Sequence, residues 1–461
     1  MRAAGHGYSL LSRSEEETIH ANVLRLVETV GLQVESEGLL ERLAADGGRV
    51  DRASQRVTYA PHVVEEFVES AATSTKLEPR VTGLVGIYYG HYLDPITDVF
   101  LPMSLEHLQA YVKVARVLPH IDQIGLLGCP VADVPAALEP LYERYWAWRL
   151  GITPFGSLHR LDLCPWILEM CQVYAQSTNQ PLDEVLTATV YLVPPLRLAY
   201  QEAAQVQWFL QRNLRVRIGA SMPTGGATAP VSLAGMVALA IAEGVLLGLL
   251  NRALFGDRTW TLTLSATAMD MRTAMRAYGR PDMAIANLVG AQMARRYRVR
   301  FEGHAGLTDA MRPSPQASAQ RLLSALPLLL STGACTIHAG LLGVDEVHSA
   351  VQMVLDDQLI SALRQFCHTY EVNDTSIGVD VVATVGPGGS FAQQEHTAAW
   401  FRREQWEPTL WERYGFAAWR DRDGRTDIDR ARAVVSGALS RATADATRMH
   451  DEVQRRLEDI L

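Results

Sequence analysis

Two polar side chains stand two positions apart in the segment RFEGHAG, residues 300–306, and a third ends a similar segment further along the chain. Glu302 and His304 lie in a run that is typical of a β-strand, and His338 closes the run ACTIH. Because side chains alternate across a strand, Glu302 and His304 are expected on one face. Two imidazoles and a carboxylate can bind zinc or iron. The same groups can instead orient a polar substrate by hydrogen bonds, or form a buried network that only stabilises the fold.

The surrounding sequence favours the hydrogen-bonding interpretation over a metal site. It contains no H-E-x-x-H pattern, and its five cysteines are scattered without a metal-binding spacing. An odd, scattered set of cysteines is typical of reduced thiols rather than of a disulfide framework. We therefore expect no bound metal. At this point the sequence does not decide between a role in substrate binding and a purely structural role for Glu302, His304 and His338.

Short apolar runs alternate with helical stretches from about residue 118 onward. Because parallel strands need a crossover between them, this alternation predicts a parallel sheet. Seven strand–helix units are recognisable, and VDVVATVGPGGSF supplies a further strand-like segment. Eight units favour a closed (β/α)₈ barrel over an open doubly wound sheet. The seven runs are IDQIGLLGCP, GITPFGSLH, LTATVYLVPP, LRVRIGASMP, TWTLTLSATA, RVRFEGHAG and ACTIHAGLLG.

The ends of these runs collect the polar residues. In a (β/α)₈ barrel the carboxyl ends of the strands form the mouth of the active site. His159, Glu302, His304 and His338 all fall at this edge. The sequence therefore predicts that these candidate residues lie together at one end of the barrel.

The chain is expected to divide into three regions. Residues 1–117 form an α+β cap, residues 118–400 the barrel, and residues 401–461 a helical extension. In the cap, GGRVDRASQRVTYAP predicts two short strands, and GIYYGHYLDPITDVFLP predicts a hairpin that turns at Asp94-Pro95.

Composition and charge argue against two classes of protein, nucleic-acid-binding proteins and membrane proteins. The chain has 461 residues, 48% hydrophobic and 20% charged, with a net charge of −9, which argues against a nucleic-acid-binding protein. Residues 231–250 are nearly long enough to cross a bilayer, but Glu243 interrupts them, so an internal helix is expected and no membrane partner. Large apolar helices of this kind are compatible with a homo-oligomer. The amino-terminal segment lacks the apolar core of a signal peptide, and we expect a cytoplasmic protein.

Several long segments resemble the trimethylamine methyltransferase superfamily, in the same order along residues 20 to 440. The resemblance implies a (β/α)₈ barrel with extra N-terminal structure. It also implies methyl transfer from a methylated amine to the cobalt(I) of a corrinoid (cobalamin) carried by a separate protein. Because only the twenty common residues occur here, the chain resembles the non-pyrrolysine branch, which demethylates quaternary amines such as glycine betaine. The segments include MPTGGATAPVSLAGMVALAIAEGV, GLTDAMRPSPQASAQRLLSALPLLLSTGA and GPGGSFAQQEHTAAWFRREQWEPTLWERYGFAAW.

On this resemblance, roles can be suggested for individual side chains. A quaternary amine already carries its charge and leaves as a neutral tertiary amine, so positioning and electrostatics dominate the chemistry. Aromatic faces attract such a cation. Glu302, His304 and His338 are the catalytic candidates. The substrate-binding candidates are Tyr88, Tyr89 and Phe391 for the ammonium group, His396 for the polar end, and His159 and Gln316 as further contacts.

The sequence thus predicts a corrinoid-dependent methyltransferase for a small, betaine-like quaternary amine, with no tightly bound cofactor of its own. Two alternatives remain. One is a metal-dependent barrel hydrolase or lyase that uses Glu302, His304 and His338. The other is a barrel that binds quaternary amines without catalysis.

Overall fold

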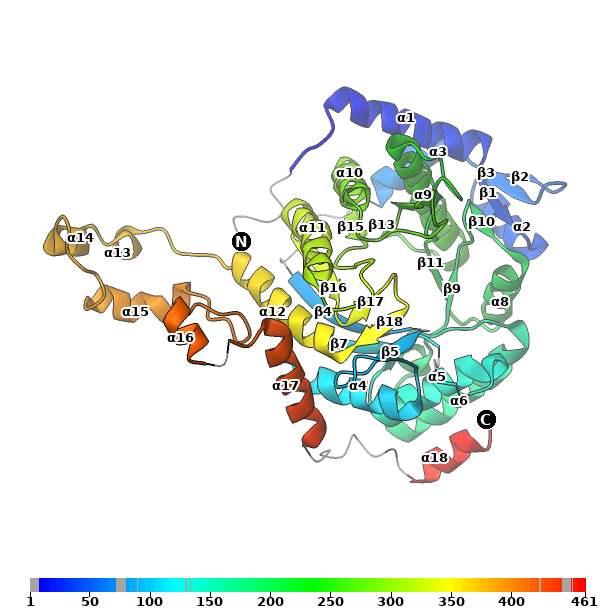
Figure 1. Ribbon diagram of the computed structural model, residues 1–461. Helices are drawn as coiled ribbons and strands as arrows, with labels where there is room; N and C mark the ends of the chain where they lie inside the picture. The colour runs from blue at the N-terminus through cyan, green and yellow to red at the C-terminus, as the bar shows by residue number, and fades with distance from the viewer. Residues whose placement is uncertain are drawn as a thin grey trace.

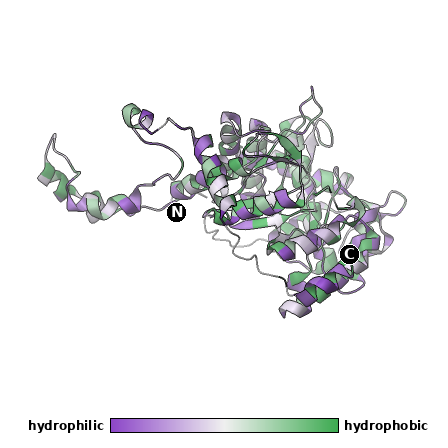
Figure 2. Cartoon of the chain, turned by 60° about the horizontal axis from the view of Figure 1, so that its bottom comes forward, coloured by the Kyte–Doolittle hydropathy of each residue, from purple (hydrophilic) through white to green (hydrophobic). Residues whose placement is uncertain are grey.

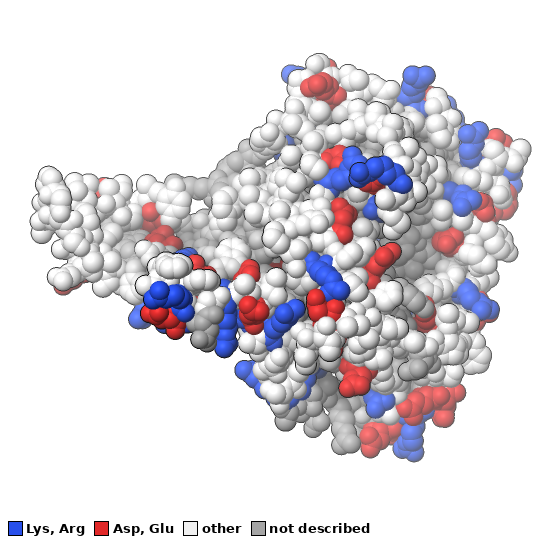
Figure 3. Space-filling view, in the orientation of Figure 1, with Lys and Arg blue, Asp and Glu red and all other residues white. Residues whose placement is uncertain are grey.

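The computed structural model describes residues 8–71, 80–88, 90–128, 131–132, 134–422, 424–441, 449 and 451–461. Strands lie at the centre of the main body, and helices surround them (Figure 1). The apolar core forms two large clusters, and Phe301 and Trp146 pack against both of them. Positive and negative side chains are interspersed over the face shown in Figure 3.

Parallel strands follow one another through the body. Five ladders join them, all parallel, and a further parallel bridge joins Ser157 to Thr189. In the described part of the chain no ladder links β11 to β13 or β15 to β16, so the hydrogen-bonded sheet is not a closed ring. The strands are β4 (Arg80–Ile87), β7 (Gln123–Leu126), β8 (Thr153–Pro154), β9 (Thr189–Tyr191), β11 (Arg217–Gly219), β13 (Thr261–Leu264), β15 (Arg300–Gly303) and β16 (Ala334–His338).

A long helix separates each of these strands from the next, and another follows β16. The predicted alternation of strands and helices is therefore confirmed, and the protein is a mixed α/β protein with parallel sheets. The helices are α4 (Leu105–Val117), α5 (Glu139–Leu150), α6 (Cys164–Thr178), α8 (Tyr200–Leu210), α9 (Leu233–Phe255), α10 (Pro281–Tyr297), α11 (Pro315–Thr332) and α12 (Ala350–Phe366). Shorter elements between them are η1 (Ala136–Leu138), η2 (Leu161–Leu163), α7 (Leu182–Val185), β12 (Thr224–Gly225) and β14 (Thr267–Ala268), the last two paired in parallel.

One predicted strand is wrong. The Val-rich segment VDVVATV forms helix α14 (Val379–Val385), although its β-branched residues favour a strand. The remaining parallel strand is β4, which lies within the range of the predicted cap and pairs with β7 and β16. Glycines weaken its strand pattern, but a Cβ at Gly83 would stand 2.2 Å from the His120 carbonyl oxygen.

The N-terminal region packs on the body through α1 (Arg13–Thr29), which contacts α9. A capping box between Ser12 and Glu15 starts this helix. The first predicted strand pair is confirmed as the antiparallel strands β2 (Arg49–Asp51) and β3 (Arg56–Thr58). β3 also pairs with β1 (Leu32–Val34), and β1 pairs in parallel with β10 (Arg197–Leu198). Helices α2 (Glu37–Ala45) and α3 (Pro61–Ser70) complete this region.

The predicted second hairpin is also confirmed and supports a loop that reaches the site. β5 (His91–Leu93) and β6 (Phe100–Pro102) are antiparallel, and Asp94 Oδ1 accepts hydrogen bonds from the backbone N–H groups of Ile96 and Thr97 in the turn. β5 pairs in parallel with β18 (Val347–Ser349), which pairs with β17 (Leu341–Leu342). The turn between β17 and β18 carries Asp345.

Helix α9 is apolar all round and lies inside the protein. By length and composition it could cross a membrane, but 83% of its most apolar window is buried. Its one acidic residue, Glu243, accepts hydrogen bonds from the backbone N–H groups of Ser221 and Leu196, at 3.0 and 3.3 Å. The prediction of an internal helix is confirmed.

The C-terminal part begins with a projecting segment, residues 367–405, which we call the arm. It contains α13 (Asp374–Ile377), α14 and α15 (Glu395–Glu404), and extends away from the body in both Figure 1 and Figure 2. After α16 (Phe416–Arg420), helix α17 (Asp427–Ser440) packs on α12 and α4, and α18 (Asp451–Glu458) packs on α6.

Candidate functional site

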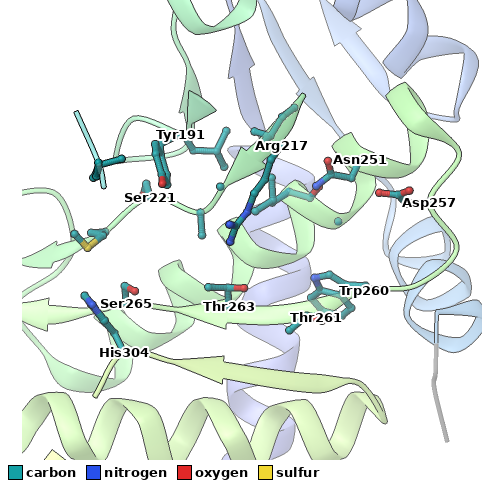
Figure 4. A pocket seen from close by; sticks show the side chains of 18 of the residues that line it. Tyr191, Arg217, Ser221, Asn251, Asp257, Trp260, Thr261, Thr263, Ser265 and His304 are labelled. Carbon is teal, nitrogen blue, oxygen red and sulfur yellow. The ribbon is translucent and has the colours of Figure 1, made fainter. Parts of the chain in front are cut away.

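A cavity of about 580 Å³ opens among residues at the carboxyl ends of the parallel strands. From there it continues along β13 towards the amino end of that strand, between β11 and β13 (Figure 4). The strand ends contribute Tyr88, Tyr191, Ser221, Ser265 and His304, and the β17–β18 turn contributes Asp345. The other half is lined by Arg217, Asn251, Asp257, Trp260, Thr261 and Thr263.

His304 and His338 come together as the sequence predicted. Their ring centroids lie 5.1 Å apart, and the Tyr278 ring lies 5.3 Å from that of His304. Burial lowers the pKa of His304 to about 4 and the pKa of His338 well below its usual value. Both imidazoles are therefore neutral at pH 7. Among the described residues, neither Nδ1 has a hydrogen-bond partner, and His304 lines the cavity while His338 lies behind it.

Asp345 is a site residue that the sequence did not predict. It follows an apolar strand in the segment LLGVDEV and adopts a left-handed φ of 72°. Burial raises the pKa of its carboxyl group to about 6, although a hydrogen bond from Tyr278 and the charges of Arg321 and Arg276 oppose this shift. Its Oδ1 has no partner within the described structure. The cavity thus holds a carboxyl group that ionises close to neutral pH.

Tyrosine faces form another part of the wall. Tyr88 follows β4, and its ring stacks on Phe155 at 6.1 Å between centroids and 18° between planes. Its backbone N–H donates to His348 Nε2 at 3.1 Å, which fixes the chain where it leaves the strand. Tyr191 ends β9 and lines the same cavity. Burial raises the pKa of both hydroxyl groups, so both side chains are neutral at pH 7.

Arg217 gives the other half of the cavity a positive charge. It begins β11, and its side chain runs into the cavity (Figure 4). The structure assigns it no hydrogen bond or ion pair with any residue that it describes. Burial raises the pKa of Tyr191 and the charge of Arg217 opposes that shift, which indicates that the two side chains are near each other. By contrast, the neighbouring Asp257 is already paired, because Arg215 Nη1 donates to its Oδ1 at 2.8 Å.

A buried arginine ties the strand ends around the histidines together. Arg321, on α11, donates to the carbonyl oxygens of Gly306 and His338 at 2.5 and 2.8 Å, and also to that of Leu341. Its Nε lies 3.2 Å from Asp356 Oδ1 on α12. Asp356 Oδ2 in turn accepts the backbone N–H of Gly340 at 2.8 Å. This pair fixes the chain at His338 and just after it, at Gly340 and Leu341.

Other predicted residues lie outside the cavity lining. Glu302 is exposed on β15, where the register sets it beside Thr263. β15 ends at Gly303, so the alternation expected to join Glu302 and His304 does not continue to His304. His159 is exposed, with Nδ1 3.9 Å from Glu139 Oε2. Gln316 is exposed at the start of α11 and donates to Gln320 at 3.5 Å.

The remaining predicted residues are on the arm or outside the description. Phe391 is exposed on the arm, and His396 stacks on Trp400 at 5.7 Å, with its Nε2 3.2 Å from the Thr375 carbonyl oxygen. The structure does not bring either residue to the cavity of its own chain. Tyr89 lies outside the described residues. Within the described ranges, no group of three or more His, Cys, Asp or Glu side chains could hold a metal ion.

Removing one partner of the buried Arg321–Asp356 pair should strongly destabilise the protein. Replacing Arg321 with Ala leaves a buried carboxylate without its partner and three carbonyl oxygens without a donor. We expect the free energy of unfolding to fall by about 3–5 kcal/mol. Urea unfolding followed by circular dichroism measures this.

Arg160→Ala is the matched control, because Arg160 and its partner Asp162 are both exposed. That variant should change the free energy of unfolding by no more than about 0.5 kcal/mol. Equal losses in the two variants would show that the buried pair has no special role.

Comparison with known proteins shows the family of the chain. The trimethylamine methyltransferase (MTTB) family model matches residues 94–461. A glycine betaine methyltransferase of Desulfitobacterium hafniense is 26% identical over 431 residues, 89% of this chain and 88% of the relative. An L-carnitine:corrinoid methyltransferase of Eubacterium limosum is 22% identical over 407 residues, 82% of each chain. A trimethylamine methyltransferase of Desulfitobacterium hafniense is 22% identical over 425 residues, 87% of this chain and 84% of the relative. Because the family model covers most of its length, this chain belongs to the trimethylamine methyltransferase family.

Proposed function

We propose that the protein removes a methyl group from a small, betaine-like quaternary amine and transfers it to the cobalt(I) of a corrinoid carried by a separate protein. The relatives named for glycine betaine and for carnitine and corrinoid support this reaction class. The observation that carries the proposal is one cavity with two tyrosine rings, a carboxyl group and the neutral imidazole of His304 at one end and an arginine without a described partner at the other.

We further propose that the eight parallel strands form a (β/α)₈ barrel with the site at its carboxyl end. The order of the strands supports this, since four ladders join consecutive strands and the fifth joins the last strand, β16, to the first, β4. In such barrels the loops after the strands carry the active site. The buried position of α9 fits a soluble, cytoplasmic protein.

The ammonium group is proposed to bind between Tyr88, Tyr191 and Asp345. Tyrosine faces attract a quaternary ammonium ion by roughly 0.5–2 kcal/mol per contact when water is excluded. An arriving cation favours the ionised carboxylate of Asp345 and so lowers the pKa that burial has raised to about 6. His304 is neutral and does not repel the cation, while its free Nδ1 can orient the substrate. Glu302 stays a predicted catalytic residue, although it is exposed beside Thr263 and outside the cavity lining.

The negative end of the substrate is proposed to bind Arg217. A guanidinium group matches a carboxylate with two parallel hydrogen bonds, and Arg217 has no described partner that would compete for it. A betaine carries a positive and a negative charge at its two ends. These charges are complementary to those of Asp345 and Arg217 at opposite ends of the cavity.

These residues mainly position the substrate, and the reaction requires little proton transfer. When the carbon–nitrogen bond of the quaternary amine breaks, the electron pair stays on nitrogen, and the product leaves as a neutral tertiary amine. The corrinoid supplies the cobalt(I) electron pair that accepts the methyl group. The protein must hold the N–CH₃ bond in line and exclude water, and such alignment is a large part of catalysis in reactions of this kind.

Methyl transfer to free cofactor tests the proposal directly. Anaerobic protein is mixed with cob(I)alamin and, in separate reactions, glycine betaine, carnitine, choline or trimethylamine. We expect methylcobalamin, followed by absorbance, with at least one of the zwitterionic amines and little with choline or trimethylamine. Silence with every amine, both with free cofactor and with candidate corrinoid proteins, would contradict the proposed reaction.

The role of Arg217 can be tested separately by binding. Arg217→Gln removes the charge that is proposed to meet the carboxylate, and a charge-assisted hydrogen bond contributes about 1.5–3 kcal/mol. The Kd for glycine betaine in calorimetry should therefore rise about 10- to 100-fold.

Arg212→Gln is the control, since Arg212 is an exposed arginine that lies over Trp208. It should leave the Kd for glycine betaine unchanged. If Arg217→Gln also leaves it unchanged, the carboxylate binds elsewhere.

A further inference from the structure

Tyr278 is buried beside the cavity but is not one of the residues that line it. It is 2% exposed, and its ring meets that of His304 nearly edge-on, at 72° between the planes. Tyr278 belongs to a small apolar cluster against which Val344 packs. Because Val344 directly precedes Asp345, this cluster supports the turn that carries the Asp345 carboxyl group.

Backbone hydrogen bonds tie Tyr278 to the same turn. The carboxylate of Asp309 accepts the N–H groups of residues 278 and 279, at 2.6 and 2.9 Å. The carbonyl oxygen of the preceding residue, Thr308, accepts the N–H of Val344 at 3.2 Å in the turn between β17 and β18. One short segment therefore holds both Tyr278 and the Asp345 turn, and fixes their relative positions.

The hydroxyl group of Tyr278 lies between two charged side chains. It hydrogen-bonds with the carboxyl group of Asp345, and the Arg276 side chain hydrogen-bonds with the same hydroxyl. Arg276 is itself held in place, since its Nη2 donates to Thr224 Oγ1 at 2.6 Å. A guanidinium group can only donate, so the hydroxyl oxygen accepts from Arg276 and the O–H is left to donate to Asp345. Burial raises the pKa of this hydroxyl group, which therefore keeps its proton.

We propose that Tyr278 is a positioning residue, which directs the carboxyl group of Asp345 towards the ammonium ion of the substrate. This role rests on the proposed function, because it requires a cation beside Asp345. The Oδ1 atom of Asp345 has no partner among the described residues and remains for the cation. An O–H donor on a carboxylate is one of the stronger hydrogen bonds in proteins. A carboxylate that is already oriented also loses less freedom when the substrate binds.

The same hydrogen bond affects the ionisation of Asp345. Burial raises the pKa of this carboxyl group to about 6, whereas the hydrogen bond from Tyr278 and the charges of Arg321 and Arg276 lower it. Tyr88 also lies near this carboxyl group, but burial raises the pKa of its hydroxyl, which stays neutral. Without the Tyr278 hydroxyl the carboxyl group loses a donor that favours its ionised form, so its pKa should rise above 6. A tyrosine that only packs against the turn would not have this effect.

Tyr278→Phe removes the hydroxyl group and keeps the ring. The titration of Asp345 is followed by NMR of protein labelled with ¹³C at its aspartate carboxyl groups, and the resonance that is lost in Asp345→Asn identifies it. We expect the midpoint to move upwards by about one pH unit in Tyr278→Phe. Calorimetric affinity for glycine betaine should accordingly fall about five-fold at pH 6 and recover by pH 8. In an Asp345→Asn background, Tyr278→Phe should leave the Kd unchanged, because the hydroxyl acts through Asp345.

Tyr145→Phe is the matched control. Tyr145 is a buried tyrosine outside the cavity, and its hydroxyl donates to Glu458 Oε1 at 2.5 Å. The control thus removes a hydroxyl group that also meets a carboxylate. It should leave both the titration of Asp345 and the affinity for glycine betaine at pH 6 unchanged.

Three outcomes distinguish this role from the alternatives. A midpoint for Asp345 that Tyr278→Phe leaves unchanged, in a protein whose fold is intact by circular dichroism, overturns the proposal. A loss of affinity that is as large in the Asp345→Asn background as in the wild type also overturns it, because Tyr278 then acts by packing alone. A shifted midpoint in a protein that binds no zwitterionic amine supports the action of Tyr278 on Asp345 and contradicts the proposed function instead.

Discussion

A buried guanidinium group holds the site together. Arg321 has no solvent exposure, and its partner Asp356 has 1%. A buried ion pair often contributes little net stability, because both charges lose their water. Here the charges are used to bind backbone: Arg321 donates to three carbonyl oxygens at the ends of β15 and β16 and at β17, and Asp356 accepts the N–H of Gly340. The positions of His338 and of the Asp345 turn follow from these bonds.

A second pair of buried charged side chains binds backbone groups near β8 and β9. Arg144 and Glu143, next to each other on α5, are both fully buried. Arg144 donates to the carbonyl oxygens of Ser157 and Thr187, and Glu143 accepts the N–H of Gly156 at 2.7 Å. Helices outside the sheet thus reach the strand ends with charged side chains. These hydrogen bonds fix the ends of the short strands. Asp345 and Arg217 are thereby held in different parts of the cavity wall.

The sequence predicted the alternation of strands and helices, the two hairpins and the internal helix, because each depends on local periodicity or turn residues. It also predicted that His304 and His338 meet, since both follow strands that end at one edge. It missed β4 because Gly83 and Gly86 interrupt its pattern, although close packing requires a glycine at Gly83. Asp345 and Arg217 were missed for another reason. Neither belongs to a motif. The significance of Asp345 lies in the burial of its carboxyl group, and that of Arg217 in its position in the cavity wall without a described partner, which only the three-dimensional arrangement reveals.

The central claim is that a cation binds beside Asp345 in a cavity lined by the neutral imidazole of His304. The pKa of Asp345 is raised to about 6, so its carboxyl group is protonated below that pH and ionised above it, whereas His304 has a pKa of about 4 and stays neutral throughout this range. The most direct measurement is calorimetric binding of glycine betaine between pH 5 and pH 8 to the wild type and to Asp345→Asn. The account predicts that affinity rises as pH increases through about 6 in the wild type and stays flat in the variant. Affinity that is independent of pH in both proteins, or the same rise in both, would contradict it.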